Sequence, residues 1–104
     1  MIKYKIQIDI DALSDIAEAT KWYNKRQPGL GQRFQKIVKT QISTLKSNAH
    51  ICTIRYKNVH CMPINKFPFM VHFRIDEVPR VVVVFAVIHT SQNPEIWEER
   101  NNPI

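Results

Sequence analysis

The side chains that could act as acids, bases or metal ligands lie mostly in the second half of this chain. His50, Cys52, His60 and Cys61 together offer the donors that a soft metal ion prefers. Their spacing lacks the paired Cys-x-x-Cys or closely spaced His pair of a zinc site, so no metal and no other cofactor is expected. The chain also has no glycine-rich phosphate loop, no serine nucleophile elbow and no carboxylate pair.

Positive charge is concentrated in the middle of the chain. The net charge is +6, but residues 19–75 contain eleven Lys or Arg and no Asp or Glu, so this stretch carries +11 and the two ends together −5. Such segregation predicts a positive face that attracts an acidic protein or a nucleic acid. A basic surface that only keeps the protein in solution is the simpler alternative.

Length and composition predict one domain over residues 1–104, because 104 residues with 44% apolar content can build a single core. The longest apolar run, residues 81–88, is far shorter than the roughly 20 residues that cross a bilayer. The N-terminal residues lack a signal-peptide apolar block. We therefore expect a cytoplasmic protein without membrane contact, whose two cysteines stay thiols even if they face each other across a hairpin.

Two helices are expected near the N-terminus. Asp9 is a plausible N-cap of the first, which should run to about Lys25 before the Pro-Gly segment stops it. Its expected buried stripe is Leu13, Ile16, Thr20 and Tyr23. The second helix has the clearer period, with Leu30, Phe34, Ile37, Val38, Gln41, Ile42 and Leu45 on one face. Its other face is a basic ridge of Gln32, Lys36, Lys39, Ser43 and Lys46.

Strand patterns flank the helices. Apolar and polar residues alternate over residues 1–9, and further strands are expected at 52–57, 59–65, 69–76 and 80–88. The last is apolar at nearly every position, which favours a central strand covered on both faces. A short helical turn is expected at 95–100, with Trp97 anchoring the tail. The order predicts an α+β fold in which a helical hairpin packs on a mainly antiparallel sheet of four to five strands.

Three segments together resemble a known family. They are WYNKRQPGLGQRF (residues 22–34), NVHCMPINKFPF (58–69) and VFAVIHTSQNPEIW (84–97). In this order and spacing they resemble the RelE/ParE toxin superfamily, specifically ParE-like chains of the plasmid-stabilisation type. The resemblance covers nearly the whole chain.

The resemblance implies a toxin of a type II toxin–antitoxin system, neutralised by a cognate acidic antitoxin. ParE-like members inhibit DNA gyrase, and RelE-like members cut mRNA on the ribosome. Metal-independent RNA cleavage needs an acid or base of near-neutral pKa among clustered cations. If the chain is a nuclease, the candidate catalytic residues are Lys57, His60, Lys66, Arg74 and His89.

This chain departs from the family pattern where cations are usual. Ribosome-dependent relatives carry Arg near the position of Met70. ParE-like relatives read Val-Arg-Arg where this chain has Val59-His60-Cys61, and they carry Arg in the segment that corresponds to residues 90–93. These departures favour a toxin that binds a protein target, with RNA cleavage or a degenerate, inactive toxin as alternatives. The candidate partner-binding residues are Arg55, Lys57, Lys66, His72, Arg74 and Trp22. Of these, His72 and Arg74 are expected to share a solvated or partner-facing side of one strand.

Overall fold

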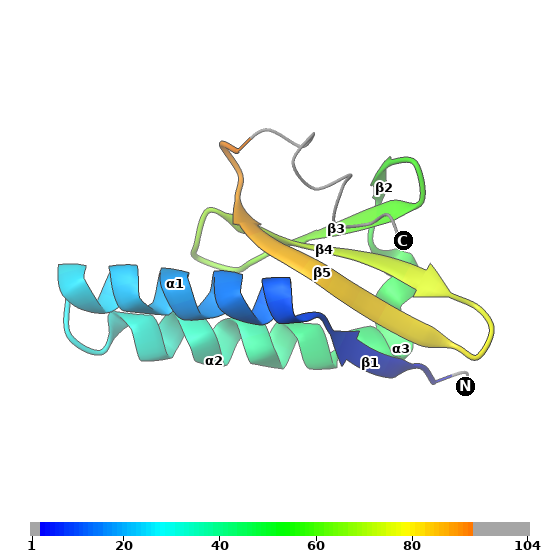
Figure 1. Cartoon of the computed structure of the whole chain (residues 1–104), viewed down its shortest axis with the longest axis horizontal. Helices are drawn as coiled ribbons and strands as arrows, with labels where there is room; N and C mark the ends of the chain where they lie inside the picture. Colours follow the sequence, from blue (N-terminus) through cyan, green and yellow to red (C-terminus); the bar gives the residue numbers. More distant parts are fainter. Residues whose placement is uncertain (1–2, 93–104) are drawn as a thin grey trace.

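The computed structural model describes residues 3–92, which form three helices, one 3₁₀ turn and five strands (Figure 1). In chain order these are β1 (Lys5–Ile8), α1 (Ile10–Arg26), α2 (Leu30–Ser43), α3 (Leu45–Asn48), η1 (Ala49–Ile51), β2 (Ile54–Tyr56), β3 (Val59–Pro63), β4 (Phe69–Asp76) and β5 (Val81–His89). The expected α+β architecture is confirmed. None of the helices within this range is long and apolar enough to cross a membrane.

The five strands form one mixed sheet in the order β1-β5-β4-β3-β2. β2, β3, β4 and β5 make three antiparallel pairs, and β1 runs parallel to β5. β5 therefore has neighbours on both sides. Residues 82–88 are all buried, so the prediction of a central strand covered on both faces is confirmed.

Helix α1 packs on the sheet through a stripe that shares Ile16 and Tyr23 with the predicted one but has Ala12 and Ala19 in place of Leu13 and Thr20. Ala12, Ile16, Ala19 and Tyr23 are buried, whereas Leu13 is half exposed. The side chains of Ala12 and Ala19 are small, so they let the helix approach the sheet closely. Asp9 occupies the N-cap position, but its carboxylate accepts a hydrogen bond from Gln7 Nε2 and makes no side-chain cap.

Helix α2 lies antiparallel to α1 on the same face of the sheet (Figure 1). Phe34, Val38 and Ile42 are buried as predicted, and the basic ridge is exposed. Phe34 packs edge-on against Phe67 and Phe69, each at a centroid distance of 5.1 Å. The aromatic residues on both sides of Pro68 thus belong to the core between helices and sheet.

The strands keep their predicted order but not all their limits. The first strand covers Lys5–Ile8 rather than residues 1–9, and β2 covers Ile54–Tyr56 rather than 52–57. β3 ends at Pro63 rather than at 65, and β5 covers Val81–His89 rather than 80–88. β4 has its predicted bounds. The helical turn expected at residues 95–100 and the anchor Trp97 lie outside the described residues.

The sheet carries apolar side chains on both faces. The main core lies between sheet and helices and includes Val71, Phe73, Val82 and Val84. A second cluster lies on the opposite face, with Tyr56 and Met70 packed against it. Its buried members are Val59, Cys61, Phe85, Ala86 and Ile88. We call this side, which points away from the helices, the outer face of the sheet.

Candidate functional site

A pocket of about 350 Å³ opens on the outer face. Its lining residues come from β2, β3, β4 and the turn that follows β5. They are Arg55, Tyr56, Cys61, Met70, His72, Thr90 and Gln92. Cys61 and His72 face each other across the β3–β4 pair, so both side chains point to the same side of the sheet.

Two β-bulges shape the outer face. In β2, Ile54 pairs with His60 and Tyr56 with Val59, which leaves Arg55 as an extra residue. In β5, Ala86 pairs with His72 and Val84 with Phe73, which leaves Phe85 extra. A bulge interrupts the alternation of side chains along a strand. As a result two consecutive residues, Arg55 and Tyr56, both line the pocket, and Phe85 and Ala86 both join the outer cluster.

His72 forms the floor of the pocket and is only 1% exposed, so the prediction of a solvated side chain is wrong. Its Nδ1 lies 3.4 Å from both the Tyr56 hydroxyl and the Cys61 Sγ. Burial, and then the positive charge of Arg55, lower the pKa of His72 to about 4. The imidazole is therefore neutral at physiological pH.

Cys61 lies beside His72 and is also buried. Burial raises the pKa of its thiol to about 11, and Arg55 only partly offsets that rise. The thiol stays protonated, and so it is a poor nucleophile. Cys52 packs against the core on the helix side, so the two thiols lie on opposite faces of the sheet rather than across a hairpin from each other.

Arg55 supplies the fixed positive charge of the pocket. Its side chain is exposed, and Nη2 lies 3.8 Å from the sulfur of Met70. Among the described lining residues it is the one that is charged at neutral pH, because His72 is neutral. The pocket thus combines one guanidinium with an apolar wall and a neutral imidazole.

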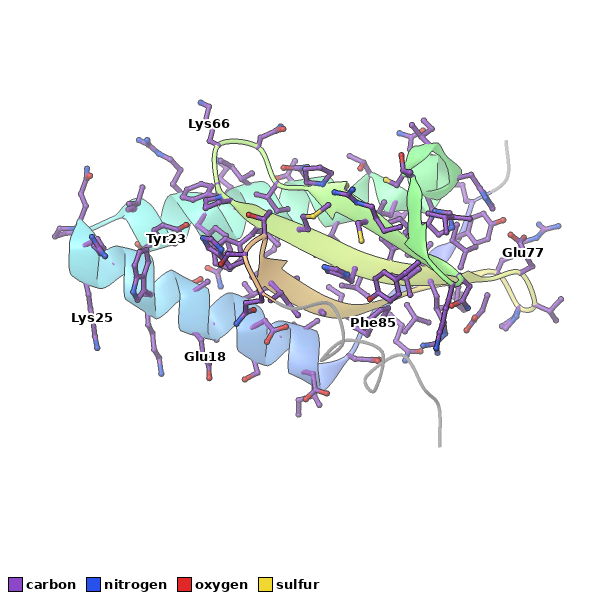
Figure 2. All side chains as sticks on the ribbon, turned by 90° about the horizontal axis from the view of Figure 1, so that it is seen from above. Glu18, Tyr23, Lys25, Lys66, Glu77 and Phe85 are labelled. Atoms are coloured by element: carbon purple, nitrogen blue, oxygen red, sulfur yellow. The ribbon has the colours of Figure 1, made fainter. Side chains whose placement is uncertain are left out.

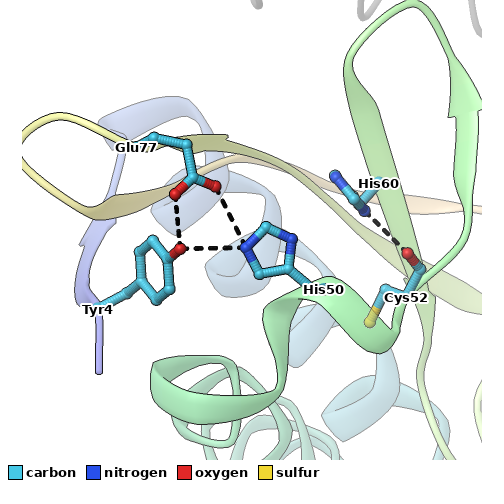
Figure 3. A network of polar contacts seen from close by, with 5 residues as sticks. All are labelled: Tyr4, His50, Cys52, His60 and Glu77. Atoms are coloured by element: carbon cyan, nitrogen blue, oxygen red, sulfur yellow. Dashed lines mark hydrogen bonds and ion pairs between the residues drawn. The ribbon is translucent and has the colours of Figure 1, made fainter. Parts of the chain in front are cut away.

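His60 lies on the other face of the sheet, toward the helices. It is 8% exposed and stacks on Phe73 at a centroid distance of 5.3 Å. Its Nδ1 lies 2.8 Å from the carbonyl oxygen of Cys52 (Figure 3). His60 is therefore separated from the outer-face pocket by the sheet itself.

A polar network that the sequence did not reveal lies near His60 (Figure 3). The Tyr4 hydroxyl donates to Glu77 Oε2 at 2.7 Å and lies 3.1 Å from His50 Nε2, which is 3.2 Å from Glu77 Oε1. The bond to Glu77 is the main cause that raises the pKa of Tyr4. The side chains of His50 and Glu77 are both 60% exposed. The network joins the chain before β1 to η1 and to the β4–β5 turn, which is a structural role.

The other candidate residues are spread along the sheet. Lys57 lies in the β2–β3 turn and Lys66 in the β3–β4 turn, so they flank opposite ends of β3. Arg74 Nε contacts Asp76 Oδ1 at 3.3 Å. His89 lies beside Phe69, and its Nδ1 accepts a hydrogen bond from the Ser91 amide at 3.1 Å. Figure 2 shows Lys66 and Glu77 at opposite ends of β4.

Trp22 lies on α1, away from the pocket, and is 51% exposed. The Arg26 guanidinium lies 4.4 Å from the centre of its ring, a cation–π contact. Its edge also meets Tyr23 at a centroid distance of 4.9 Å. Trp22 is therefore available at the surface and at the same time supports the end of the helical hairpin.

The sequence of this chain matches the model of a known protein family. The model for the ParE toxin of type II toxin–antitoxin systems, parDE, matches residues 6–94, which is most of the chain. The chain belongs to the ParE toxin family. It is thus a toxin of a type II toxin–antitoxin system, and the resemblance to the RelE/ParE superfamily is confirmed.

Solved structures share the fold of this ParE-family toxin. The chromosomal ParDE system from P. aeruginosa matches with a TM-score of 0.75 and 13% identity, over 86% of this chain and 98% of the other. A mutant of the E. coli toxin RelE in the free state matches with a TM-score of 0.70 and 14% identity, over 95% of each chain. The toxin–antitoxin complex RelBE2 from Mycobacterium tuberculosis gives 0.61 and 16%, over 88% and 97%.

No curated protein sequence matches the toxin significantly. Identities of 13–16% to the solved structures establish the fold alone. The chemistry of this toxin therefore has to be argued from its own residues. The pocket residues Tyr56, Cys61 and Met70 were not predicted as site residues, although alternation along β4 places Met70 on the same side as His72.

Proposed function

We propose that this toxin acts in the cytoplasm as a single binding domain that docks on a protein target, with DNA gyrase as the expected target, and that a cognate acidic antitoxin silences it. The observation that carries the proposal is the separation of the candidate catalytic residues. His60 lies on the helix side of the sheet, whereas Arg74 lies on the outer face, and Lys57 and Lys66 lie in turns at opposite ends of β3. General acid–base chemistry requires the acid or base within hydrogen-bond reach of the reacting group.

The protonation state of the pocket also supports binding rather than cleavage. A histidine that acts as a general acid must be an imidazolium at neutral pH, and His72, with a pKa of about 4, is a neutral imidazole there. A base with so low a pKa is weak. Stabilising the charge that builds on a phosphate calls for clustered cations, and the described lining of the pocket holds only Arg55.

The contacts to target and antitoxin are proposed on the outer face and its rims. Arg55 lies at the pocket, Lys57 and Lys66 in the turns at either end of β3, and Arg74 on β4. The +11 charge of residues 19–75 makes an acidic partner the complementary one. His72 takes part through the pocket it lines, and Trp22 offers a second, separate contact on α1.

Induction of the toxin in cells tests the proposal. Growth arrest is expected, together with changed plasmid supercoiling and without codon-positioned cuts in translated mRNA, as mapped by primer extension. Cuts that disappear in Lys66→Ala or Arg74→Ala would establish the RelE-like nuclease instead. A toxin that leaves growth unchanged at confirmed expression would be the degenerate form.

A further inference from the structure

The outer-face pocket has two chemically distinct parts. Its wall is mainly apolar and sulfur-containing, with Cys61 and Met70 beside the neutral ring of His72. Its rim carries the exposed guanidinium of Arg55. An apolar wall removes hydrocarbon from water without a preferred direction, whereas a guanidinium selects a planar anion in a fixed geometry.

We propose that this pocket takes an apolar side chain whose neighbouring residue places a carboxylate on Arg55, both from one segment of an acidic partner protein. The inference rests on the proposed function, because it specifies how a partner would dock. The proposed occupant is an apolar residue next to an acidic one, such as Leu-Asp. The pocket volume of about 350 Å³ lies at the lower end of the range of ligand-pocket volumes, roughly 300–1,000 Å³. This volume suits one apolar side chain with a neighbouring carboxylate.

Arg55 is available for this contact. Within residues 3–92 its contacts are to sulfur-bearing side chains, Met70 at 3.8 Å and Cys61, and none is to a carboxylate. Sulfur is a weak hydrogen-bond acceptor, so a carboxylate that replaced it would bind the guanidinium more strongly. The bulge in β2 puts Arg55 next to Tyr56 in the lining of the pocket, and Arg55 Nη2 reaches the sulfur of Met70, which also lines it.

A carboxylate fits this site better than a nucleic acid does. Binding to a phosphate backbone depends on several cations that each neutralise a phosphate. Arg74, on the same face, is already in contact with Asp76 at 3.3 Å, and Lys57 and Lys66 lie at opposite ends of β3. One guanidinium over an apolar wall instead matches a single charge attached to an apolar body.

Titration of the purified full-length toxin with the dipeptide N-acetyl-Leu-Asp-amide tests the inference. The readout is the ¹³C-methyl resonances of the methionines, because Met70 lines the pocket and Met62 packs on the helix side of the sheet as an internal control. The Met70 resonance should shift and that of Met62 should not. The uncharged N-acetyl-Leu-Asn-amide should bind about twofold to fivefold more weakly, as expected for one partly exposed ion pair.

The variant Arg55→Met should abolish the preference for Asp over Asn. Lys36→Met on the α2 ridge, which makes the same change in net charge, should keep it. Equal binding of the two dipeptides, an unchanged Met70 resonance, or tighter binding of uridine monophosphate than of the dipeptide would each overturn the inference. The titration needs neither antitoxin nor target, so its failure beside intact growth arrest would refute the pocket assignment and leave the proposed function standing.

Discussion

At the scale of single residues, the buried imidazole of His72 decides the chemistry of the outer face. Its neutrality follows from burial at 1% exposure and from Arg55 nearby, not from any property visible in the sequence. Alternation along β4 placed His72 and Arg74 on one side correctly. It could not show that His72 is buried there, because the residues that surround it, Tyr56, Cys61 and Phe85, come from three other strands.

The burial of His72 predicts a pH dependence of stability. Its pKa is about 4 in the folded protein against 6.5 for a free side chain, so between these values the unfolded chain binds a proton that the folded one excludes. The free energy of unfolding should therefore fall as pH is lowered from about 6.5 to about 4, by up to about 3 kcal/mol from this group. Urea unfolding at several pH values measures it.

The contribution of His72 is isolated by two variants. His72→Gln should show a smaller loss of unfolding free energy over this pH range than the natural chain. His89→Gln, which removes a partly exposed histidine at the end of β5, should retain the full loss. Identical pH profiles for His72→Gln and the natural chain would contradict the assignment.

Asp15 is a second residue whose role comes from the fold. β1 pairs with β5 only as far as Val84, and beyond that point the Val87 amide donates to Asp15 Oδ2 at 3.0 Å. Asp15→Ala should leave this buried amide without its acceptor and lower the free energy of unfolding by about 1–2 kcal/mol. Hydrogen exchange of the Val87 amide should accelerate. Glu18→Ala, on the exposed side of α1 (Figure 2), should change stability by less than about 0.5 kcal/mol; equal effects would disprove the role of Asp15.

At the scale of elements, periodicity was sufficient where one face of an element packs and the other is solvated. The buried stripe of α2 and its basic ridge follow directly from a 3.6-residue period. In α1, Ile16 and Tyr23 were predicted correctly, but the other two buried positions were each misplaced by one residue, because alanine gives a weak apolar pattern and yet permits close packing. The bulges and the short β2 could not be predicted, since they depend on pairing between strands.

The junction of α1 and α2 makes a prediction at this scale. The Gly31 amide donates to Asn24 Oδ1 at 2.7 Å, and a methyl group on Gly31 would overlap the Thr20 carbonyl oxygen and lie 2.6 Å from Asn24 Cγ. Because backbone cannot yield as a flexible side chain can, Gly31→Ala should force the helices apart. The expected loss is about 3 kcal/mol in the free energy of unfolding, measured by urea denaturation.

Gly29 provides the matched comparison. It has a φ of 89°, but a methyl group there meets no atom within 4 Å. Gly29→Ala should therefore cost only the conformational strain, about 1 kcal/mol. A Gly31→Ala variant no less stable than Gly29→Ala would show that the hairpin tolerates a wider separation of its helices.

At the scale of the whole molecule, the charge segregation and the family were readable from the sequence, and the arrangement of the site was not. The acid-free stretch of residues 19–75 runs from the second half of α1 through α2, α3, β2 and β3 to the end of β4. Folding distributes its cations over the α2 ridge, the turns of the sheet and the outer face. The candidate catalytic residues, which span positions 57–89, lie on both faces of the sheet and in two turns at opposite ends of β3.

The central claim is that this toxin acts by docking through its outer face and not by cutting RNA. Growth after induction of the natural chain, Arg55→Met and His89→Gln, at equal expression, tests it most directly. We predict arrest by the natural chain and by His89→Gln, and clearly more surviving colonies with Arg55→Met, because Arg55 lies at the pocket that we propose as the docking site. Survival with His89→Gln and undiminished arrest with Arg55→Met would contradict the account.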